Sequence, residues 1–417
     1  MVRKSDPLKG HVKIDGAKNS ALPIIAASLL GTEDIILEDV PALADVKVIL
    51  QVLKELGAVI EYLDENTVKI NSANLSSYQT PYELMSKMRA SFLVMGPLLA
   101  RLGRTETHMP GGCAIGSRPI DLHLKGFIAL GALVNENTNV IGAKAANGLI
   151  GDIIYLDFPS VGATQNIMMA ATHAKGETVI ENAAKEPEIV DLANFLNKMG
   201  ADIKGAGTSS IRIKGVNKLK GCTHQIIPDR IEAATFMVAA AITKGDVTIE
   251  NVITSHIRPV IAKLKEIGCI IEEFENEDVV RVIGPDKPRG TRIKTLPYPG
   301  FPTDVQAQFM ALMTVCEGIS KVEETVFENR FMHVDELNKM GALIVTEGKE
   351  ARIAGVPKLK GANVKATDLR AGAALILVGL IAEGITAVSD IYHIDRGYNN
   401  IVGKLRGLGA NIDRIVD

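Results

Sequence analysis

The sequence contains no tryptophan, and aromatic residues make up only 4% of its 417 positions. Its core must therefore consist mainly of aliphatic side chains, which fits the 47% content of hydrophobic residues. An excess of one charge is also lacking, since 46 Lys and Arg are balanced by 49 Asp and Glu, for a net charge of −3. No global basic field indicates a nucleic-acid partner. An anionic ligand would have to be bound by local groups of Arg and Lys.

Cysteine is scarce, and the four present form no Cys-x-x-Cys pair and have no nearby His at metal-ligand spacing: Cys113, Cys222, Cys269 and Cys316. This pattern argues against a zinc site and a disulfide framework. Residues 1–7 lack the apolar stretch of a signal peptide, and the longest apolar run, residues 371–382, is interrupted by glycine and too short for a membrane span. We expect a cytoplasmic protein without a membrane segment.

A chain of this length predicts two or three domains, and one phrase recurs in it six times. The phrase is a helix end, a glycine, a small residue and then a strand, and its glycines lie 68 to 74 residues apart: Gly57, Gly131, Gly200, Gly268, Gly341 and Gly409. Each glycine fits the position after a helix end, where a positive φ costs glycine little. The alternation that follows, as in residues 59–62 and 270–273, predicts half-buried strands.

Each repeat therefore contains two helices and about four short strands, which predicts an α/β (or α+β) fold of six βαβαββ-type units. We expect two lobes of three units. Lobe one comprises residues 1–20 and 229–417, and lobe two comprises residues 21–228. The alternative is one elongated array of six units; the fold class is the same in both cases.

One segment, residues 108–123, follows no repeat logic. Its glycines and prolines exclude a continuous helix or strand, and it holds Cys113 five positions before Arg118. An accessible thiol beside a cation has a lowered pKa and can donate and accept protons. The alternative is that Cys113 fills a small buried site. The other three cysteines lie in the repeat framework and are interpreted as structural.

Several charged residues stand at junctions between predicted elements. Lys18 precedes an apolar helix, where an anionic ligand would relieve its conflict with the helix dipole; Asn19 or Ser20 as a plain N-cap is the alternative. Further basic residues at such junctions are Arg89, Arg330, Arg370 and Arg396. Asp304 follows a proline-rich turn and is either a structural N-cap or first-turn acid, or a general base. The alternative for each arginine is an ordinary surface salt bridge. Because so many of these residues stand at junctions in separate units, we favour a shared cleft that binds an anion.

The segment from Pro110 to His123 resembles the catalytic loop of the enolpyruvyl transferases that act on UDP-N-acetylglucosamine. Further matching motifs are residues 16–19, 159–164, 228–233, 301–304, 368–370 and 395–398, so the similarity extends along the whole chain. The resemblance implies a two-lobed, inside-out α/β barrel with three units in each lobe. It also implies an enzyme that needs no cofactor or metal and catalyses the first committed step of peptidoglycan synthesis.

The implied reaction joins phosphoenolpyruvate to the 3-hydroxyl of UDP-N-acetylglucosamine through a tetrahedral ketal and releases phosphate. The resemblance assigns catalytic roles to Cys113, Asp304, Lys18 and Arg396, with Cys113 as the proton donor and the target of fosfomycin. The implied phosphoenolpyruvate contacts are Lys18, Asn19, Arg118, Arg370 and Arg396. The implied nucleotide-sugar contacts are Asn19, Arg89, Arg118, Pro119, Ile120, Asp121, Leu122, Ser160, Val161, Gly162, Asp304 and Val326.

Phe158 departs from the pattern, because some relatives have a lysine there that contacts the nucleotide. Two alternatives remain at this point. One is a transferase similar to 5-enolpyruvylshikimate-3-phosphate synthase, whose family lacks the cysteine loop. The other is a non-catalytic protein that binds nucleotide sugars, which would not need the full set of charged residues. The sequence does not define the oligomeric state, and a monomer is compatible with it.

Overall fold

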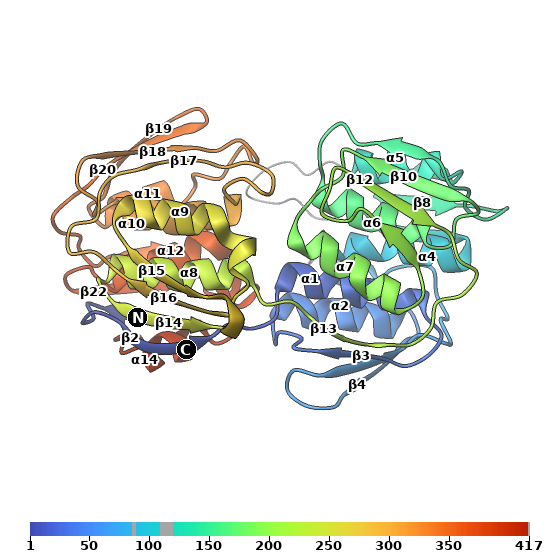
Figure 1. Ribbon diagram of the computed structural model, residues 1–417, viewed down its shortest axis with the longest axis horizontal. Coiled ribbons are helices and arrows are strands. Elements are labelled where there is room, and N and C mark those ends of the chain that lie inside the picture. Colours follow the sequence, from blue (N-terminus) through green and yellow to red (C-terminus); the bar gives the residue numbers. More distant parts are fainter. Residues whose placement is uncertain (86–88, 109–119, 138, 416–417) are drawn as a thin grey trace. The chain divides into compact units, whose positions relative to one another are not determined.

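The computed structural model describes residues 1–85, 89–108, 120–137 and 139–415, which form two compact units (Figure 1). Unit 1 contains residues 1–15 and 228–415, and unit 2 contains the described residues from 16 to 227. In the described chain the backbone passes between the units after Asp15 and after Ile227. Lys18 and Asn19 therefore belong to unit 2. The boundary expected from the sequence, after residue 20, places them in the other lobe.

The described residues form six small sheets, three in each unit, which agrees with the six sequence repeats. The sheets of unit 2 have the strand orders β13-β3-β5-β4, β6-β8-β7 and β11-β12-β10-β9. Their strands are β3 (Ile35–Glu38), β4 (Val59–Tyr62), β5 (Val68–Asn71), β6 (Arg104–His108), β7 (Leu133–Glu136), β8 (Val140–Lys144), β9 (Ile153–Tyr155), β10 (Glu177–Glu181), β11 (Asp202–Lys204), β12 (Ser210–Lys214) and β13 (Thr223–Gln225).

The sheets of unit 1 have the strand orders β15-β16-β14-β2, β17-β18-β20-β19 and β1-β22-β21. Their strands are β1 (Val2–Arg3), β2 (Lys9–Lys13), β14 (Asp246–Glu250), β15 (Ile270–Phe274), β16 (Val279–Ile283), β17 (Arg292–Lys294), β18 (Ile319–Glu323), β19 (Leu343–Glu347), β20 (Glu350–Ala354), β21 (Asn363–Lys365) and β22 (Ile385–Ser389). Each of the six sheets has three or four strands and contains at least one antiparallel pair. Sheets of this size are stable when one face packs against helices.

Three helices pack against one another in the middle of each unit. They are α1 (Lys18–Ala27), α4 (Met95–Leu102) and α6 (Val161–Ala171) in unit 2, and α8 (Arg230–Ile242), α10 (Gln306–Met313) and α12 (Leu369–Gly379) in unit 1. The remaining α-helices are α2 (Ala44–Glu55), α3 (Tyr82–Met85), α5 (Asp121–Ala129), α7 (Pro187–Lys198), α9 (Arg258–Ile267), α11 (Val334–Lys339), α13 (Tyr392–Asp395) and α14 (Ile401–Gly407). Short 3₁₀ helices are η1 (Ser28–Leu30), η2 (Arg89–Val94), η3 (Thr254–Ile257), η4 (Glu275–Glu277) and η5 (Thr303–Val305).

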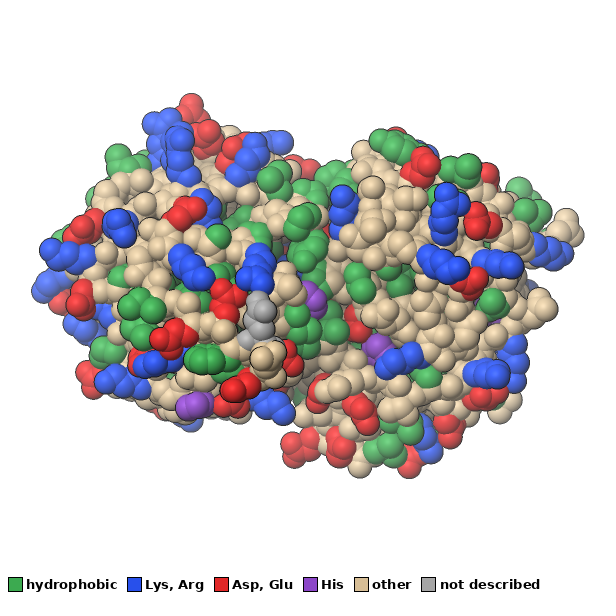
Figure 2. Space-filling model, viewed as in Figure 1, with side chains coloured by type: hydrophobic (Ala, Val, Ile, Leu, Met, Phe, Trp, Pro, Cys, Tyr) green, Lys and Arg blue, Asp and Glu red, His purple; other side chains and the backbone are tan. Residues whose placement is uncertain are grey.

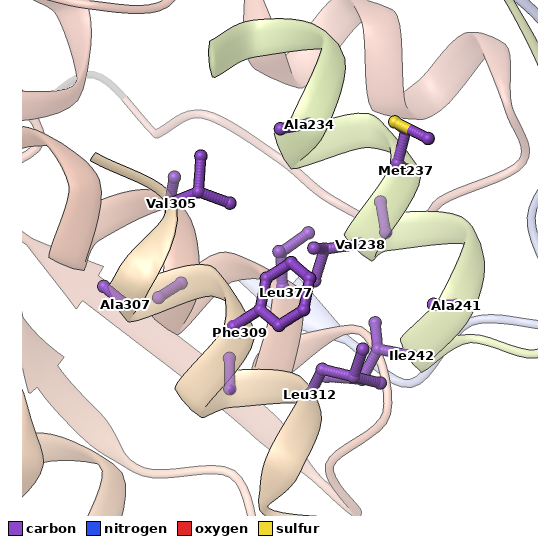
Figure 3. Packing of buried hydrophobic residues seen from close by; sticks show 14 of the residues in the cluster. Ala234, Met237, Val238, Ala241, Ile242, Val305, Ala307, Phe309, Leu312 and Leu377 are labelled. Carbon is purple, nitrogen blue, oxygen red and sulfur yellow. The ribbon is translucent and has the colours of Figure 1, made fainter. Parts of the chain in front are cut away.

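The central helices are buried because they are apolar around most of their circumference. In α8 every residue after Arg230 is buried, and small side chains such as Ala234 and Ala241 allow the helices to approach closely. Figure 3 shows Phe309 of α10 and Leu377 of α12 meeting Val238 of α8 in this core. Figure 1 shows the strands outside the helices in each unit, so each unit is an inside-out α/β structure.

All six repeat glycines have the predicted positive φ, with values from 88° at Gly131 to 114° at Gly268. Strands follow the first five of these glycines, but after Gly409 the described residues form only an isolated bridge between Ile412 and Val2. The prediction that the strands are half-buried is wrong for β4 and β15. Val59 is 65% exposed and Ile270 is 58% exposed. Both strands lie at the edge of their sheets, so the apolar side chains on their outer faces have no covering layer.

Two repeats exchange their first strands. In the third and fifth repeats the first strand pairs in parallel with the strand after the next helix, β9 with β10 and β17 with β18. In the first repeat β2 precedes α1 but pairs with β14, and in the fourth repeat β13 precedes α8 but pairs with β3. Each unit therefore contains one strand whose own helix belongs to the other unit.

Candidate functional site

An aspartate precedes or begins each central helix of unit 1, and only two of the three cap a helix. Asp229 accepts hydrogen bonds from the first backbone N–H groups of α8, and Asp368 does the same for α12. Asp304 lies in η5, directly before α10, and its carboxylate caps neither helix. Asp304 is therefore not an N-cap, but it is an acid in the first turn of η5, as the structural alternative also expected.

The carboxylate of Asp304 is held between two buried arginines. Arg330 Nη2 lies 3.0 Å from Oδ1, and Arg370 Nη2 lies 3.2 Å from Oδ2. The side chains of Arg330 and Arg370 are only 3% and 2% exposed, whereas that of Asp304 is 27% exposed. Two buried arginines thus hold a carboxylate that solvent or a ligand can reach, and charge-assisted contacts of this kind fix its orientation.

Arg370 has donor capacity left over. Its Nε and Nη1 atoms are buried and have no hydrogen-bond partner among the described residues. Burial opposes its charge, but Tyr398, Asp304 and Asp229 nearby keep the pKa of Arg370 above the usual value, so it stays a cation. Buried N–H groups without acceptors are costly, and an anionic oxygen would satisfy them.

A buried glutamate that the sequence analysis missed supports this region. Glu324 is 1% exposed, and its Oε1 accepts hydrogen bonds from Thr295 and from the backbone N–H of Val326. Its Oε2 accepts a hydrogen bond from Thr303, the residue before Asp304. Glu324 thereby fixes both the turn that contains the predicted contact Val326 and the start of η5. No local pattern distinguishes it from an ordinary strand-end acid, because its side-chain partners Thr295 and Thr303 are distant in sequence.

Arg396 lies in the turn directly after α13 and is half-buried. The next residue, Gly397, packs on the start of α12, because a Cβ there would lie 2.2 Å from Leu369 Cδ1 and 3.5 Å from Arg370 Nη1. The turn that carries Arg396 is therefore packed against the helix start that carries Arg370. In unit 1 the structure brings Asp304 and Arg370 into contact and places Arg396 on an adjoining turn.

In unit 2, Lys18 is the first residue of α1 and forms a buried ion pair with Asp45 in the first turn of α2. The Lys18 Nζ–Asp45 Oδ2 distance is 2.6 Å, and the two side chains are 8% and 5% exposed. The predicted conflict between Lys18 and the helix dipole is thus already relieved within the protein. Asn19 and Ser20 do not cap α1, since its N-cap is Ala17. Ser20 instead donates a hydrogen bond to Asp191 of α7.

The start of α6 contains three predicted nucleotide-sugar contacts, Ser160, Val161 and Gly162. Ser160 caps the helix by accepting a hydrogen bond from the N–H of Ala163 at 3.3 Å. Gly162 faces the ring of His123 on α5, where a Cβ would lie 3.2 Å from Cε1. The predicted contacts Ile120, Asp121 and Leu122 begin that same helix and are half-buried or exposed. The beginnings of α5 and α6 are therefore packed together.

His123 is held in place by a residue that the sequence analysis did not single out. Asn166 of α6 lies 3.1 Å from His123 Nδ1, and its Oδ1 accepts a hydrogen bond from the N–H of Gly96 at 2.7 Å. Phe158, which precedes α6, is 47% exposed. This cluster connects α4, α5 and α6 at the end where the predicted contacts lie.

Several predicted site residues lie outside the described part of the chain: Cys113, Arg118 and Pro119. Arg89 belongs to η2, but its side chain is not among those described. The remaining cysteines are poor nucleophiles. Burial raises the pKa of Cys269 and of Cys316 to about 12, and burial also raises that of Cys222.

Within the described residues no cluster of three or more His, Cys, Asp or Glu side chains could bind a metal ion. The helices of that same part are all too short or too polar to cross a membrane. On the face that Figure 2 shows, basic and acidic side chains are interspersed within each unit. This distribution agrees with the small net charge of the chain.

Two inside-out α/β units of three sheets each agree with the architecture that the resemblance to the enolpyruvyl transferases implies. The family model described as EPSP synthase (3-phosphoshikimate 1-carboxyvinyltransferase) matches residues 2–405, and this chain belongs to that family. The chain is 73% identical over 414 residues to the UDP-N-acetylglucosamine 1-carboxyvinyltransferase of Finegoldia magna, covering 99% of this chain and 98% of the relative. It is 63% identical to UDP-N-acetylglucosamine 1-carboxyvinyltransferase 1 of Caldanaerobacter subterraneus subsp. tengcongensis, covering 99% of each.

Solved structures share the fold. The enolpyruvyl transferase NikO from Streptomyces tendae has a TM-score of 0.88 at 23% identity and covers 98% of this chain and 97% of its own. An EPSP synthase from Acinetobacter baumannii has a TM-score of 0.76 at 19% identity, with the same shares covered. The predicted family and fold class are confirmed, and the alternative of one elongated array of six units is wrong.

Proposed function

We propose that this chain transfers the enolpyruvyl group of phosphoenolpyruvate to the 3-hydroxyl of UDP-N-acetylglucosamine and releases inorganic phosphate. The structural observation that carries the proposal is the Asp304 carboxylate, which two buried arginines orient while it stays accessible. The relatives at 63% and 73% identity, which are named for this reaction, support the choice of acceptor. The EPSP synthase structures at 19% identity support only the fold.

The proposed chemistry is an addition followed by an elimination. Asp304 orients the sugar hydroxyl and takes its proton while the oxygen attacks C2 of phosphoenolpyruvate. A proton is delivered to C3 in the same phase, which gives a tetrahedral ketal. The ketal then loses a C3 proton and its phosphate, so the C2–C3 double bond forms again. In this scheme Cys113 supplies and recovers the C3 proton.

The basic residues of the site are proposed to neutralise the negative charge of the substrates. Arg370 has unpartnered N–H groups, which would donate to a carboxylate or phosphate oxygen and so stabilise developing charge. We propose the same task for Arg396, Lys18 and Arg118.

The nucleotide sugar would contact the beginnings of α5 and α6, where Ser160, Gly162 and Leu122 lie. It would also contact Asn19, Arg89 and the turn that contains Val326.

We also propose that the enzyme is cytoplasmic and begins peptidoglycan synthesis. The test mixes the purified full-length chain with phosphoenolpyruvate and UDP-N-acetylglucosamine and measures phosphate release. A parallel reaction contains shikimate 3-phosphate as the acceptor. We expect phosphate release only with the nucleotide sugar. Release only with shikimate 3-phosphate, or none with either acceptor from folded protein, would contradict the proposal.

The roles of Asp304 and Cys113 are tested with two variants of similar shape. Asp304→Asn keeps the size of the side chain but removes the base, and Cys113→Ser replaces the thiol with a much weaker acid. Each is expected to lower kcat by at least about a hundredfold, the usual scale for a lost acid or base. Tyr155→Phe, on the exposed strand β9, is the matched control and should keep full activity. Wild-type turnover in either variant would remove that residue from the mechanism.

A further inference from the structure

The buried hydroxyl of Tyr398, which the proposed mechanism does not use, lies close to the Asp304–Arg370 ion pair. Tyr398 is 2% exposed, and its hydroxyl lies 2.9 Å from Thr235 Oγ1 on α8. The Thr235 hydroxyl donates its only proton to the carbonyl of Ile231 at 2.8 Å. Thr235 must therefore accept from Tyr398, so the Tyr398 O–H has a defined direction.

Gln308 connects this hydroxyl to the backbone of the proposed base. Its Nε2 has three acceptors within hydrogen-bond distance, which are the carbonyl oxygen of Asp304 at 3.0 Å, Thr235 Oγ1 at 3.1 Å and the Tyr398 hydroxyl at 3.2 Å. Gln308 is fully buried. Since one amide group contacts both residues, the position of the Tyr398 hydroxyl limits where the amide, and hence the Asp304 backbone, can lie.

The ring of Tyr398 lies beside the second partner of Asp304. The guanidinium carbon of Arg370 is 5.3 Å from the ring centre, within the range of a cation–π contact. Burial raises the pKa of the Tyr398 hydroxyl above its ordinary value, so the hydroxyl keeps its proton and can act as the donor to Thr235. One side chain thus contacts Thr235 of α8, Gln308 of α10 and Arg370 of α12.

We propose that Tyr398 is a positioning residue for enolpyruvyl transfer: its hydroxyl, through Gln308, and its ring, beside Arg370, hold Asp304 in the orientation that accepts the acceptor's proton. The inference rests on the proposed function. It goes beyond that function because Tyr398 is buried beneath Asp304 and is not itself proposed to touch either substrate. A residue that holds a general base in place contributes to the rate through geometry, because a small displacement of the base lowers the rate strongly.

The test substitutes Tyr398→Phe, which removes one oxygen and keeps the ring beside Arg370. We expect kcat to fall about tenfold, while the KM values for both substrates change less than about threefold, since ground-state contacts are retained. The matched control is Thr314→Val, at the far end of α10, which removes a buried hydroxyl that donates to Ala311. Thr314→Val should lower the melting temperature by about as much as Tyr398→Phe does, and it should leave kcat unchanged.

A double-mutant cycle separates positioning from general destabilisation. If Tyr398 acts through Arg370 and Asp304, then adding Tyr398→Phe to Arg370→Lys should lower kcat little beyond the effect of Arg370→Lys alone. Fully additive losses, or a wild-type kcat in Tyr398→Phe, would overturn the inference. An inactive wild-type chain would instead overturn the proposed function, and with it the reaction that this network serves.

Discussion

Glu232 of α8 is a buried carboxylate whose titration should be measurable in the stability of the protein. Its Oε1 lies 2.7 Å from Lys404 Nζ, and its Oε2 accepts a hydrogen bond from the N–H of Asp15 at 2.9 Å. Lys404 also contacts the Asp15 carboxylate, at 3.0 Å. Burial raises the pKa of Glu232 from 4.5 to about 7, although Lys404 acts in the opposite direction. At about 1.4 kcal/mol per pKa unit, this difference corresponds to about 3 kcal/mol.

The sign follows from the direction of the shift. A carboxyl whose folded-state pKa lies above its unfolded value contributes stability that is fully present below the unfolded pKa, here 4.5. That contribution is lost as the pH rises through about 7. Glu232→Gln cannot ionise and lacks this dependence. The free energy of unfolding of wild type minus that of Glu232→Gln should therefore fall by about 3 kcal/mol between a pH below 4.5 and a pH above about 7.

The assay is urea unfolding at several pH values, followed by far-ultraviolet circular dichroism because the chain has no tryptophan. Lys404→Met serves as a second variant. Since Lys404 lowers the pKa of Glu232, its removal should move the loss of stability to higher pH. A wild-type minus Glu232→Gln difference that stays constant within about 0.5 kcal/mol across the pH range, the scale of ordinary surface effects, would refute the reasoning.

Two further predictions concern the thiols and the buried ion pair. Limited alkylation at neutral pH, or treatment with fosfomycin, should label Cys113 alone, because the raised pKa values of the other three cysteines leave little thiolate; peptide mass mapping that finds the label on Cys222 first would contradict this. Asp45→Asn should destabilise the protein by about 3 kcal/mol, because it leaves the Lys18 ammonium buried without its carboxylate. The double variant Lys18→Met/Asp45→Leu should recover much of that loss in urea unfolding, and a double variant no more stable than Asp45→Asn would show that the charge is not the cause.

The repeat architecture could be predicted because its signals are local. Gly57 and the five glycines equivalent to it need a positive φ wherever a helix ends, and the structure confirms this at all six. Exposure of the edge strands could not be predicted in the same way. The alternation in residues 59–62 specifies a strand, but which face is covered depends on what packs against the sheet.

The site residues were predictable in type but not in their partners. Asp304 and Arg370 are 66 residues apart in the chain, yet their side chains form an ion pair. Lys18 was expected to need an anion, and that anion is Asp45, a residue with no sequence signal of its own. Glu324 and Tyr398 act through buried hydrogen bonds to distant elements, which only tertiary packing creates. The role of Cys113 remains a prediction from the sequence.

The exchange of β2 and β13 has a consequence for how the chain can be cut and rejoined. All strands of unit 2 lie between residues 16 and 227, so a fragment of these residues retains them, whereas residues 228–417 alone lack β1 and β2. During synthesis β2 leaves the ribosome long before its partner β14, and unit 1 cannot be completed until the second half of the chain is made. The Met1 amino group donates a hydrogen bond to the carbonyl of Asp413 at 2.8 Å, so a short linker could join the ends. A circular permutant that begins at Pro228 and ends at Ile227 would then make unit 1 as one continuous segment.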